Sequence, residues 1–318
     1  MRTPKRIEFD PGLTQHYSGR LRRTINDDGS FNVSRRGVGL RDKGFYLHLM
    51  SSNWPFFLAQ VGLAYTFVNV LFAALYCWIG VESLAGATHD GPLDSFLNAF
   101  FFSVQTFTTV GYGHVAPRGI AANSVAAFEA MTGLLAFALG TGLLYGRFSR
   151  PSARIAFSRQ MVIAPFNDGR ALMFRVANQR PNVLMELEAT VLMMTVEEGS
   201  GGMQRRYQPL SLERDKVFFL PLSWTLVHAI AEDSPLNGLG PKELQALQAE
   251  FLILVKAFDD TFGQTVHARR SYTFDEVEWG QRFLPAFAVT GDGDLELDLS
   301  LLNAAAPASP ELPEAPQT

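Results

Sequence analysis

The chain has 318 residues, of which 47% are hydrophobic, and its formal net charge is −4. The lack of a basic excess argues against a nucleic-acid partner. The single cysteine, Cys77, excludes an intramolecular disulfide and a zinc site built from cysteines, and the six histidines show no paired metal-ligand spacing. The sequence has no GxGxxG, GxxxxGK(S/T) or GxSxG motif, so it suggests neither an enzyme nor a bound cofactor.

Residues 1–41 are polar and rich in Arg and Gly, and they predict a flexible cytoplasmic N-terminus. They lack the apolar stretch of a signal peptide, so we expect the N-terminus to stay on the side where it is made. Residues 42–54 mix apolar with polar side chains and end at Trp54, which Pro55 follows. This pattern predicts a short slide helix lying along a membrane surface, with a simple linker as the alternative.

Two apolar segments predict a transmembrane domain over residues 55–150. Residues 55–79 carry no formal charge, and residues 120–145 carry only Glu129; we place the second span at about 120–147. Each segment is long enough to cross roughly 30 Å of hydrocarbon as a helix. Basic residues flank both spans on one side, which predicts that both termini are cytoplasmic. These residues are Arg35, Arg36, Arg41, Lys43, Arg147, Arg150, Arg154 and Arg159.

Residues 94–113, between the spans, predict a re-entrant segment. Residues 94–107 are apolar but too short to cross a membrane as a helix, and Asp94 or Ser95 is placed to cap their N-terminal end. The following residues, 108–113, predict non-helical backbone at membrane depth. Such backbone is tolerated only where it is buried in protein or lines a water-filled path.

After Pro151 the pattern changes to short apolar and β-branched runs separated by turn residues, which predicts an antiparallel β-sandwich over residues 151–302. The GSGG sequence at 199–202 is the clearest hairpin signal. The single cysteine is typical of an intracellular soluble part. Residues 303–318 are rich in Pro and Ala and predict a disordered tail.

The sequence TTVGYG at 108–113 contains TVGYG, the signature of potassium-selective filters. A dehydrated K⁺ ion needs rings of oxygen in place of its water. Backbone carbonyls of Thr109, Val110, Gly111 and Tyr112 from four chains would supply stacked rings, with the Thr109 hydroxyl adding the innermost one. Aiming successive carbonyls one way requires unusual backbone angles, which Gly111 and Gly113 adopt without a Cβ clash. A chance loop of this sequence is the alternative, but its place between two spans and after a short helix disfavours it.

Several strings, in order, resemble the prokaryotic branch of the inward-rectifier potassium channel family. They are SSNWPFF, FFFSVQTFTTVGYG, YGRFSRP, VIAPFNDGRALMFRVANQR, EDSPLNGL and QTVHARRSY, and the likeness covers roughly residues 44–299. The resemblance implies a homotetramer in a cell membrane, with K⁺ as the permeant ion, an immunoglobulin-like cytoplasmic domain and gating by anionic lipid. The location we expect is a prokaryotic plasma (inner) membrane.

The resemblance also implies roles for residues near the cytoplasmic end of the second span. Tyr145 matches the aromatic gate at the bundle crossing, with a lipid-facing aromatic as the alternative. Gly133 is a candidate hinge, with close helix packing as the alternative. Arg147, Arg150 and Arg154 match a phosphoinositide site, although Ser152-Ala153 replaces the lysine-rich run of relatives. Ordinary positive-inside charge is the alternative for these arginines.

Further positions bear on the cavity and on the cytoplasmic passage. Glu188 and Asp259 match acidic residues that line a cytoplasmic vestibule, with plain surface charge as the alternative. Phe137 stands where strongly rectifying relatives carry an acid, which predicts weak block by polyamines or magnesium. Gln105 and Val115 replace a Glu–Arg pair behind the filter of many relatives. For Glu129, we favour packing behind the filter over lining the cavity.

Two competing interpretations remain. A ligand-gated channel with a nucleotide-binding domain would show βαβ alternation and a phosphate loop after Pro151, and neither is present. The second interpretation is a membrane-tethered β-sandwich binding module with a non-conducting pore. A potassium flux assay distinguishes this module from a channel.

Overall fold

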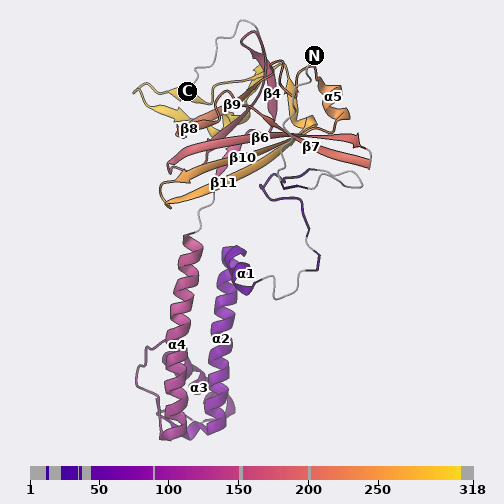
Figure 1. Cartoon of the computed structure of the whole chain (residues 1–318). Coiled ribbons are helices and arrows are strands. Elements are labelled where there is room, and N and C mark those ends of the chain that lie inside the picture. Colours follow the sequence, from indigo (N-terminus) through magenta and orange to yellow (C-terminus); the bar gives the residue numbers. More distant parts are fainter. Residues whose placement is uncertain are drawn as a thin grey trace. The chain divides into compact units, whose positions relative to one another are not determined.

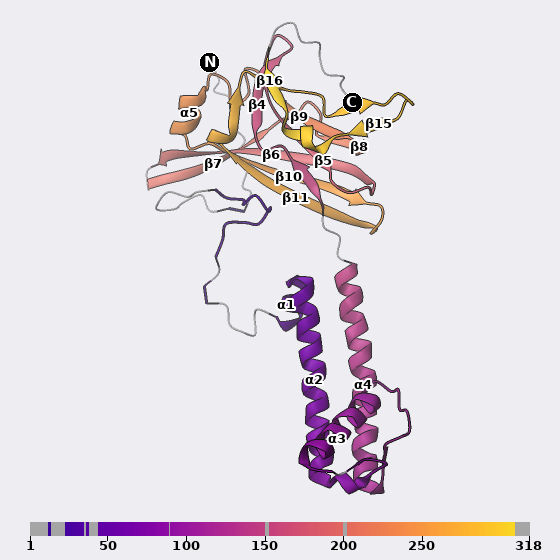
Figure 2. The same ribbon diagram turned by 180° about the vertical axis from the view of Figure 1, so that it is seen from behind.

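The computed structural model describes residues 12–13, 23–34, 36–37, 44–88, 90–149, 153–199 and 202–308. The chain divides into two units, one formed by residues 35–150 and the other by residues 1–34 and 151–318 (Figures 1 and 2). We call them the helical unit and the β-rich unit and describe each by itself. Arg150, most of the predicted flexible N-terminus and residues 309–318 lie outside the described residues.

The described part of the helical unit contains four helices. They are α1 (Phe45–Ser51), α2 (Trp54–Ile79), α3 (Pro92–Phe107) and α4 (Gly119–Phe148). The helices α2 and α4 are long and apolar enough to cross a membrane, as expected. A break at Ser52 and Asn53 separates α1 from α2, and the Asn53 side chain accepts a hydrogen bond of 3.2 Å from the Phe56 amide at the start of α2. Trp54 therefore belongs to the span rather than to the preceding short helix.

The short helix α3 begins at Pro92, two residues earlier than expected, and Asp94 does not cap it. The Asp94 carboxylate instead accepts hydrogen bonds from the Thr88 hydroxyl at 2.7 Å and the Asp90 amide at 3.2 Å. The N-cap residue is Gly91, with no side-chain cap, so the prediction that Asp94 or Ser95 caps this helix was wrong.

A small element that the sequence did not suggest closes the loops around α3. After a 3₁₀ turn (Val81–Ser83), β1 (Leu84–Ala85) pairs with β2 (Ala116–Pro117), so the segments before α3 and after 108–113 are joined. A side chain at Gly86 would overlap the His114 carbonyl oxygen, because an ideal Cβ would lie 2.1 Å from it. This close backbone approach and the φ of +88° both require glycine at this position.

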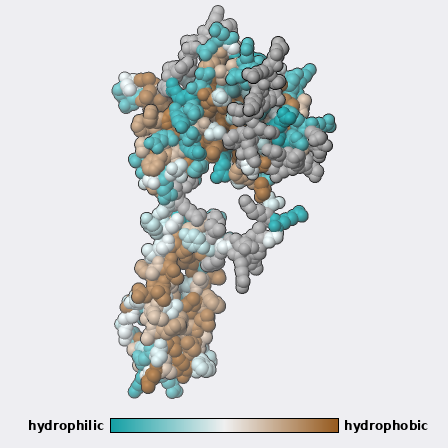
Figure 3. All heavy atoms as spheres, viewed as in Figure 1, coloured by the Kyte–Doolittle hydropathy of each residue, from teal (hydrophilic) through white to brown (hydrophobic). Residues whose placement is uncertain are grey.

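The helical unit leaves most of its apolar surface outward. Only 17% and 11% of the most apolar windows of α2 and α4 are buried within the chain. Hydrophobic side chains accordingly cover these helices in Figure 3. A small core does form where α3 meets the two long helices, and it includes Phe72, Tyr76, Phe102 and Phe107. Helices with this distribution suit a membrane or contact with other copies better than water.

The described part of the β-rich unit contains two five-stranded sheets. One has the order β11-β10-β6-β7 with β8 beside β6, and the other has the order β12-β4-β5-β3 with β9 beside β5. All of these pairs are antiparallel except β12 with β4. The strands are β3 (Ile155–Phe157), β4 (Met161–Phe166), β5 (Gly169–Asn178), β6 (Leu184–Gly199), β7 (Gly202–Leu210), β8 (Lys216–Phe219), β9 (Ser223–Ala229), β10 (Glu250–Asp259), β11 (Gln264–Thr273) and β12 (Val277–Trp279).

The hairpin predicted at GSGG is confirmed, because β6 and β7 pair up to Gly199 and Gly202. The short helix α5 (Pro241–Ala246) and two 3₁₀ turns, Phe274–Glu276 and Leu299–Asn303, complete the connections. Two further ribbons are formed by β13 (Gln281–Phe283) with β16 (Ala305–Pro307) and by β14 (Phe287–Val289) with β15 (Leu295–Leu297). The prediction of a disordered tail from residue 303 therefore places its start too early, since Ala305–Pro307 form a paired strand.

The main core of this unit includes inward-facing residues of both sheets, such as Phe174, Phe251 and Val255. The other faces are also partly covered: Ile25 packs against the β6-β7-β10 sheet, and Phe283 packs against β4 and β5. Strands covered on both faces read as nearly continuous apolar runs. This explains why the sequence of β5 shows little alternation.

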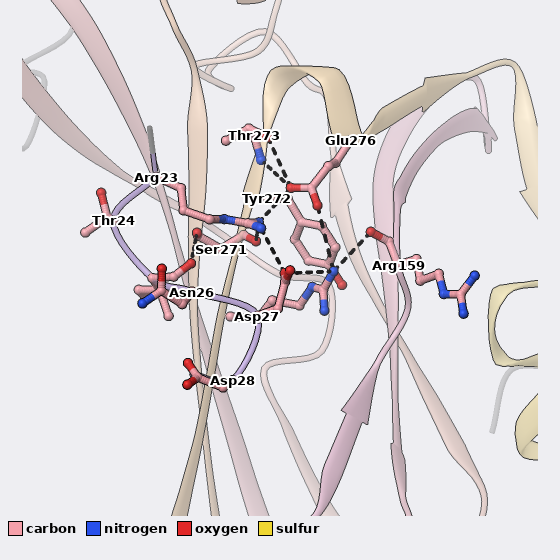
Figure 4. Close-up of polar contacts among 12 residues, drawn as sticks. Arg23, Thr24, Asn26, Asp27, Asp28, Arg159, Ser271, Tyr272, Thr273 and Glu276 are labelled. Carbon is pink, nitrogen blue, oxygen red and sulfur yellow. Dashed lines mark hydrogen bonds and ion pairs between the residues drawn. The ribbon is translucent and has the colours of Figure 1, made fainter. Parts of the chain in front are cut away.

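The N-terminal segment 23–34 is bound to the β-rich unit, which corrects the expectation that residues 1–41 are flexible throughout. Arg23 donates to the Ser271 carbonyl at 2.6 Å and pairs with Glu276 at 2.8 Å (Figure 4). The Thr24 amide and hydroxyl each donate to the buried Glu250 carboxylate at 2.7 Å. These contacts, with the burial of Ile25, fix this segment beside β10 and β11.

Candidate ion filter and its supporting helices

The backbone that follows α3 has the alternating conformation that a carbonyl-lined filter needs. The φ angles of Thr109, Gly111 and Gly113 are +59°, +50° and +80°, while Val110 and Tyr112 between them have negative φ. The prediction of unusual angles at the two glycines is confirmed. The positive φ of Thr109 was not predicted, because a non-glycine residue rarely adopts this conformation and the sequence gives no sign of it.

The filter's amides and carbonyls are used differently. The amides of Val110 and Gly111 both donate to the Gln105 carbonyl, at 2.9 and 3.2 Å, which ties them to the last turn of α3. Within the described part of the chain, no group donates to the carbonyl oxygens of Thr109, Val110, Gly111 or Tyr112. These four residues are exposed in the single chain, so their carbonyl oxygens are open to a cation as well as to water.

Side chains of the filter are exposed in the single chain. Val110 is 55% exposed and Tyr112 is 79% exposed. The outward aromatic packing expected for Tyr112 is therefore not made within one chain and requires another copy.

Four buried polar residues from three helices meet beside α3. The Glu129 carboxyl on α4 accepts a hydrogen bond of 2.6 Å from the Tyr76 hydroxyl on α2 and contacts the Ser103 hydroxyl on α3. Ser103 also lies 3.0 Å from Oδ1 of Asn69, which is on α2. All four side chains are fully buried. The preference for packing behind the filter over lining the cavity is therefore supported for Glu129. The sequence analysis did not predict the partners of Glu129, although polar residues within the apolar helices could have indicated them.

Gly133 lies one turn after Glu129, where α4 closely approaches the end of α3. An ideal Cβ on Gly133 would lie 2.0 Å from the Phe107 carbonyl oxygen, which no side chain tolerates. Close helix packing thus accounts for this glycine. A hinge at Gly133 stays a prediction.

Phe137 and Tyr145 on α4 are 75% and 74% exposed in the single chain. Both lie within the second span, toward its C-terminal end. Their exposure leaves them available to a passage or to lipid, so the gating role of Tyr145 stays a prediction.

Arg147 is already engaged by protein groups. Its guanidinium donates to the Leu49 carbonyl at 2.6 Å and to the Ser52 carbonyl, and it lies over the rings of Trp54 at 4.7 Å and Phe57 at 4.8 Å. Arginine suits this combination, because its planar fork both donates hydrogen bonds and stacks on aromatic rings. A lipid role for Arg147 would have to compete with these contacts.

The other two candidate lipid ligands do not belong to the described part of the helical unit. Arg154 is exposed and belongs to the β-rich unit, whereas Arg147 belongs to the helical unit. Arg150 lies outside the described residues. The lipid site stays a prediction.

The two candidate vestibule acids differ. Glu188 is partly exposed and lies 3.5 Å from the Lys216 ammonium. Asp259 is only 1% exposed, and its carboxylate accepts hydrogen bonds from Asn182 at 2.8 Å and the Thr261 amide at 3.0 Å. The expectation that Asp259 lines an open vestibule is therefore wrong, because its carboxylate holds the β10–β11 turn. The role of Glu188 stays a prediction.

Each of the two units matches a known protein family. Residues 155–315 match the model of the inward rectifier potassium channel C-terminal domain, and residues 56–149 match an ion channel model. The inward rectifier potassium channel Kirbac3.1 of Paramagnetospirillum magnetotacticum is 37% identical over 282 residues, which cover 87% of this chain and 93% of that protein.

Animal relatives are more distant. The human G protein-activated inward rectifier potassium channel 1 is 28% identical, with 89% of this chain and 60% of that protein covered. The inward rectifier potassium channel irk-1 of Caenorhabditis elegans is 26% identical, with 90% and 57% covered. The chain thus spans about three fifths of these animal relatives and nearly all of the bacterial one. With both of its units matched, the chain belongs to the inward rectifier potassium channel family.

Proposed function

We propose that four identical copies of the chain surround one axis and form a potassium-selective channel of inward-rectifier type. The observation that carries this proposal is the run of positive φ angles at Thr109, Gly111 and Gly113, with the intervening carbonyls left unpartnered. Successive carbonyls aimed at one axis replace the water of a dehydrated K⁺ ion. The filter carbonyls of Thr109, Val110, Gly111 and Tyr112 are the K⁺ ligands.

Assembly of copies is supported by what the single chain leaves exposed. Val110, Tyr112 and most of the apolar surface of α2 and α4 have no cover within the chain. One chain also supplies only one oxygen at each level of the filter, whereas a cation needs several. Fourfold assembly satisfies both needs.

The location follows from the spans and their flanking charges. We place α2 and α4 across the plasma membrane of a prokaryote, with both termini and the β-rich unit in the cytoplasm. Basic residues flank the two spans on this side, including Arg147 in the last turn of α4. The likeness to a bacterial protein supports a prokaryotic source.

Gating is a finer part of the proposal. The Tyr145 rings of four copies would meet at the cytoplasmic end of α4 and close the passage by excluding water. Anionic lipid, of which phosphoinositide is the probe we choose, would bind the arginines after α4 and bias the open and closed states unequally. Phe137 takes the place of the acidic residue of strongly rectifying relatives, so we expect only weak block by polyamines.

The direct test is potassium flux in liposomes that contain the purified protein. A potassium-selective channel gives a potassium flux that barium blocks, and it gives no comparable sodium flux. A membrane-tethered binding module with a dead pore gives no flux above empty liposomes, although it still forms tetramers, and this result would overturn the proposal.

A further inference from the structure

In the buried cluster of Asn69, Tyr76, Ser103 and Glu129, two contacts of the Ser103 hydroxyl compete for its one hydrogen. The Ser103 hydroxyl oxygen lies within hydrogen-bond distance of two oxygens, Oδ1 of Asn69 at 3.0 Å and Oε1 of Glu129. A hydroxyl has one hydrogen to donate. Ser103 can therefore donate to one of these oxygens only, and the other contact needs a hydrogen from elsewhere.

The orientation of the Asn69 amide settles which contact lacks a hydrogen. Its Nδ2 donates to the Tyr65 carbonyl at 2.8 Å, so turning the amide over would place two acceptor oxygens against each other. Oδ1 of Asn69 thus faces Ser103 as an acceptor. Ser103 donates to Asn69, and the contact between Ser103 and Glu129 must use a hydrogen carried by Glu129.

The Tyr76 hydroxyl does not supply that missing hydrogen. It donates to the second carboxyl oxygen of Glu129, Oε2, at 2.6 Å. Oε1 of Glu129 is the atom that faces Ser103. A hydrogen on Oε1 gives every donor in the cluster one acceptor.

We propose that Glu129 is a neutral carboxylic acid that donates its hydrogen to Ser103 and completes a four-residue chain joining α2, α3 and α4. In this chain Tyr76 donates to Glu129, Glu129 to Ser103, Ser103 to Asn69, and Asn69 to the Tyr65 carbonyl. The chain makes Glu129 a positioning residue for the filter. That second part rests on the proposed channel function, whereas the protonation of Glu129 does not.

Charge leads to the same assignment. The helices α2, α3 and α4 contain one basic residue, Arg147, which is eighteen positions beyond Glu129 and is engaged with the Leu49 and Ser52 carbonyls. An ionised Glu129 would therefore be a buried charge at membrane depth without a cation from these helices. Such charges are costly, whereas a neutral acid with two hydrogen-bond partners is not.

The chain reaches the filter through one turn of α3. Ser103 lies two residues before Gln105, whose carbonyl accepts the amides of Val110 and Gly111. Close contact of Gly133 with the Phe107 carbonyl fixes the end of the same turn. Release of Ser103 would let this turn shift against α4, and the filter amides would shift with it.

The first test is the infrared spectrum of the purified tetramer at neutral pH. Exposed carboxylates are ionised there, so a protonated buried acid gives a separate carbonyl band that shifts in heavy water. We expect this band in the parent protein and its loss in Glu129→Gln. Absence of the band from the parent would overturn the proposal, and this result does not depend on ion flux.

The second test compares Glu129→Gln with Glu129→Leu in liposomes. Glutamine retains one acceptor for Tyr76 and one donor for Ser103, so it replaces the neutral acid but not a carboxylate. We expect Glu129→Gln to keep the potassium/sodium selectivity of the parent. Glu129→Leu has a similar size and no hydrogen bonds, and we expect about a tenfold loss of selectivity, the size of effect that one buried hydrogen bond supports.

Controls separate positioning from general stability. Tyr76→Phe removes one donor of the chain and should lower selectivity, whereas Thr66→Val on the same helix removes a hydroxyl that bonds only to the Gly62 carbonyl and should not. Tetramer formation is measured for every variant. Equal selectivity in assembled Glu129→Leu and Glu129→Gln would overturn the positioning role, and a parent that conducts no potassium would instead contradict the proposed function.

Discussion

The Arg147 guanidinium at the end of α4 donates a hydrogen bond of 2.6 Å to the backbone carbonyl of Leu49 in α1. The last turn of the second span is thereby tied to the short helix that precedes the first span. Any movement of α4 that opens or closes a passage must move α1 or break this bond. The sequence indicated a positive charge and a candidate lipid ligand at this position, but not this bond.

Arg147→Ala should destabilise the tetramer even in lipid without net charge. The change removes hydrogen bonds to two carbonyls and stacking on Trp54 and Phe57, worth about 1–3 kcal/mol together. Thermal unfolding in neutral lipid nanodiscs measures this effect. Arg147→Lys is the matched control, because it keeps the charge but loses the planar fork, and we expect it to be destabilised as well. If Arg147 serves only anionic lipid, both variants will unfold like the parent in neutral lipid.

Gly111→Ala should abolish potassium/sodium discrimination while the tetramer still forms. An ideal Cβ on Gly111 meets no atom within 4 Å in the single chain, so the cost comes from the φ of +50°, which is unfavourable for a residue with a side chain. Paired potassium and sodium flux assays measure the effect. Gly62→Ala in α2, where the Cβ also meets nothing, is the control and should leave selectivity unchanged. Normal selectivity in Gly111→Ala would contradict the filter assignment.

Tyr145→Ala should raise basal potassium flux, because removal of four rings would widen and wet the proposed closure. Single-channel recording or liposome flux measures the change. Phe148→Ala, which removes an exposed aromatic side chain three residues further along α4, is a suitable control. An assembled Tyr145→Ala channel with unaltered flux would indicate that this ring faces lipid.

Neutralising Arg150 and Arg154 together should blunt the response to phosphoinositide. We expect phosphoinositide, added to liposomes of neutral and anionic lipid, to lower potassium flux in the parent, as we infer from the resemblance to prokaryotic relatives. Dose–response curves for the double variant, with Arg159→Gln as the control, measure the contribution of the two arginines. A parental response in the double variant would show that these arginines serve membrane topology alone.

Acidification should destabilise the β-rich unit through His228. Its Nδ1 lies 2.6 Å from the Ser211 carbonyl and its Nε2 lies 2.8 Å from the Ser234 hydroxyl, so the buried ring is used as a neutral donor and acceptor. Burial lowers the pKa of His228 below its ordinary value of 6.5, although the Ser211 carbonyl and nearby Asp233 and Glu213 oppose the shift. The unfolded chain therefore binds a proton more readily than the folded one.

The sign of the pH effect follows from that difference. The stability linked to His228 is fully present above a pH of about 6.5 and is lost as the pH falls toward the lower pKa of the folded state. Thermal unfolding at several pH values measures the slope. His228→Gln should flatten it, and His267→Gln, which removes an exposed histidine, should not. Equal slopes in all three proteins would show that another group controls acid stability.

The elements that depend on local physics could be predicted from the sequence. The lengths of the two apolar runs fix the spans, the short apolar run before TTVGYG fixes a helix that cannot cross, and Gly111 and Gly113 permit the filter's backbone angles. The GSGG hairpin is local in the same way. Hydrophobic length and glycine φ angles depend on neighbouring residues only, so they can be read along the chain.

Contacts between residues distant in the sequence could not be predicted in this way, and they appear only in the folded chain. Glu129 meets Tyr76 across 53 positions and Ser103 across 26, and Arg147 meets Leu49 across 98. The burial of Asp259 and the docking of Arg23 on Ser271 are likewise invisible in the sequence. The direction of a side chain around a helix, and the register of one strand on the next, are fixed only when the elements pack, because packing decides which polar groups lose water and must find partners.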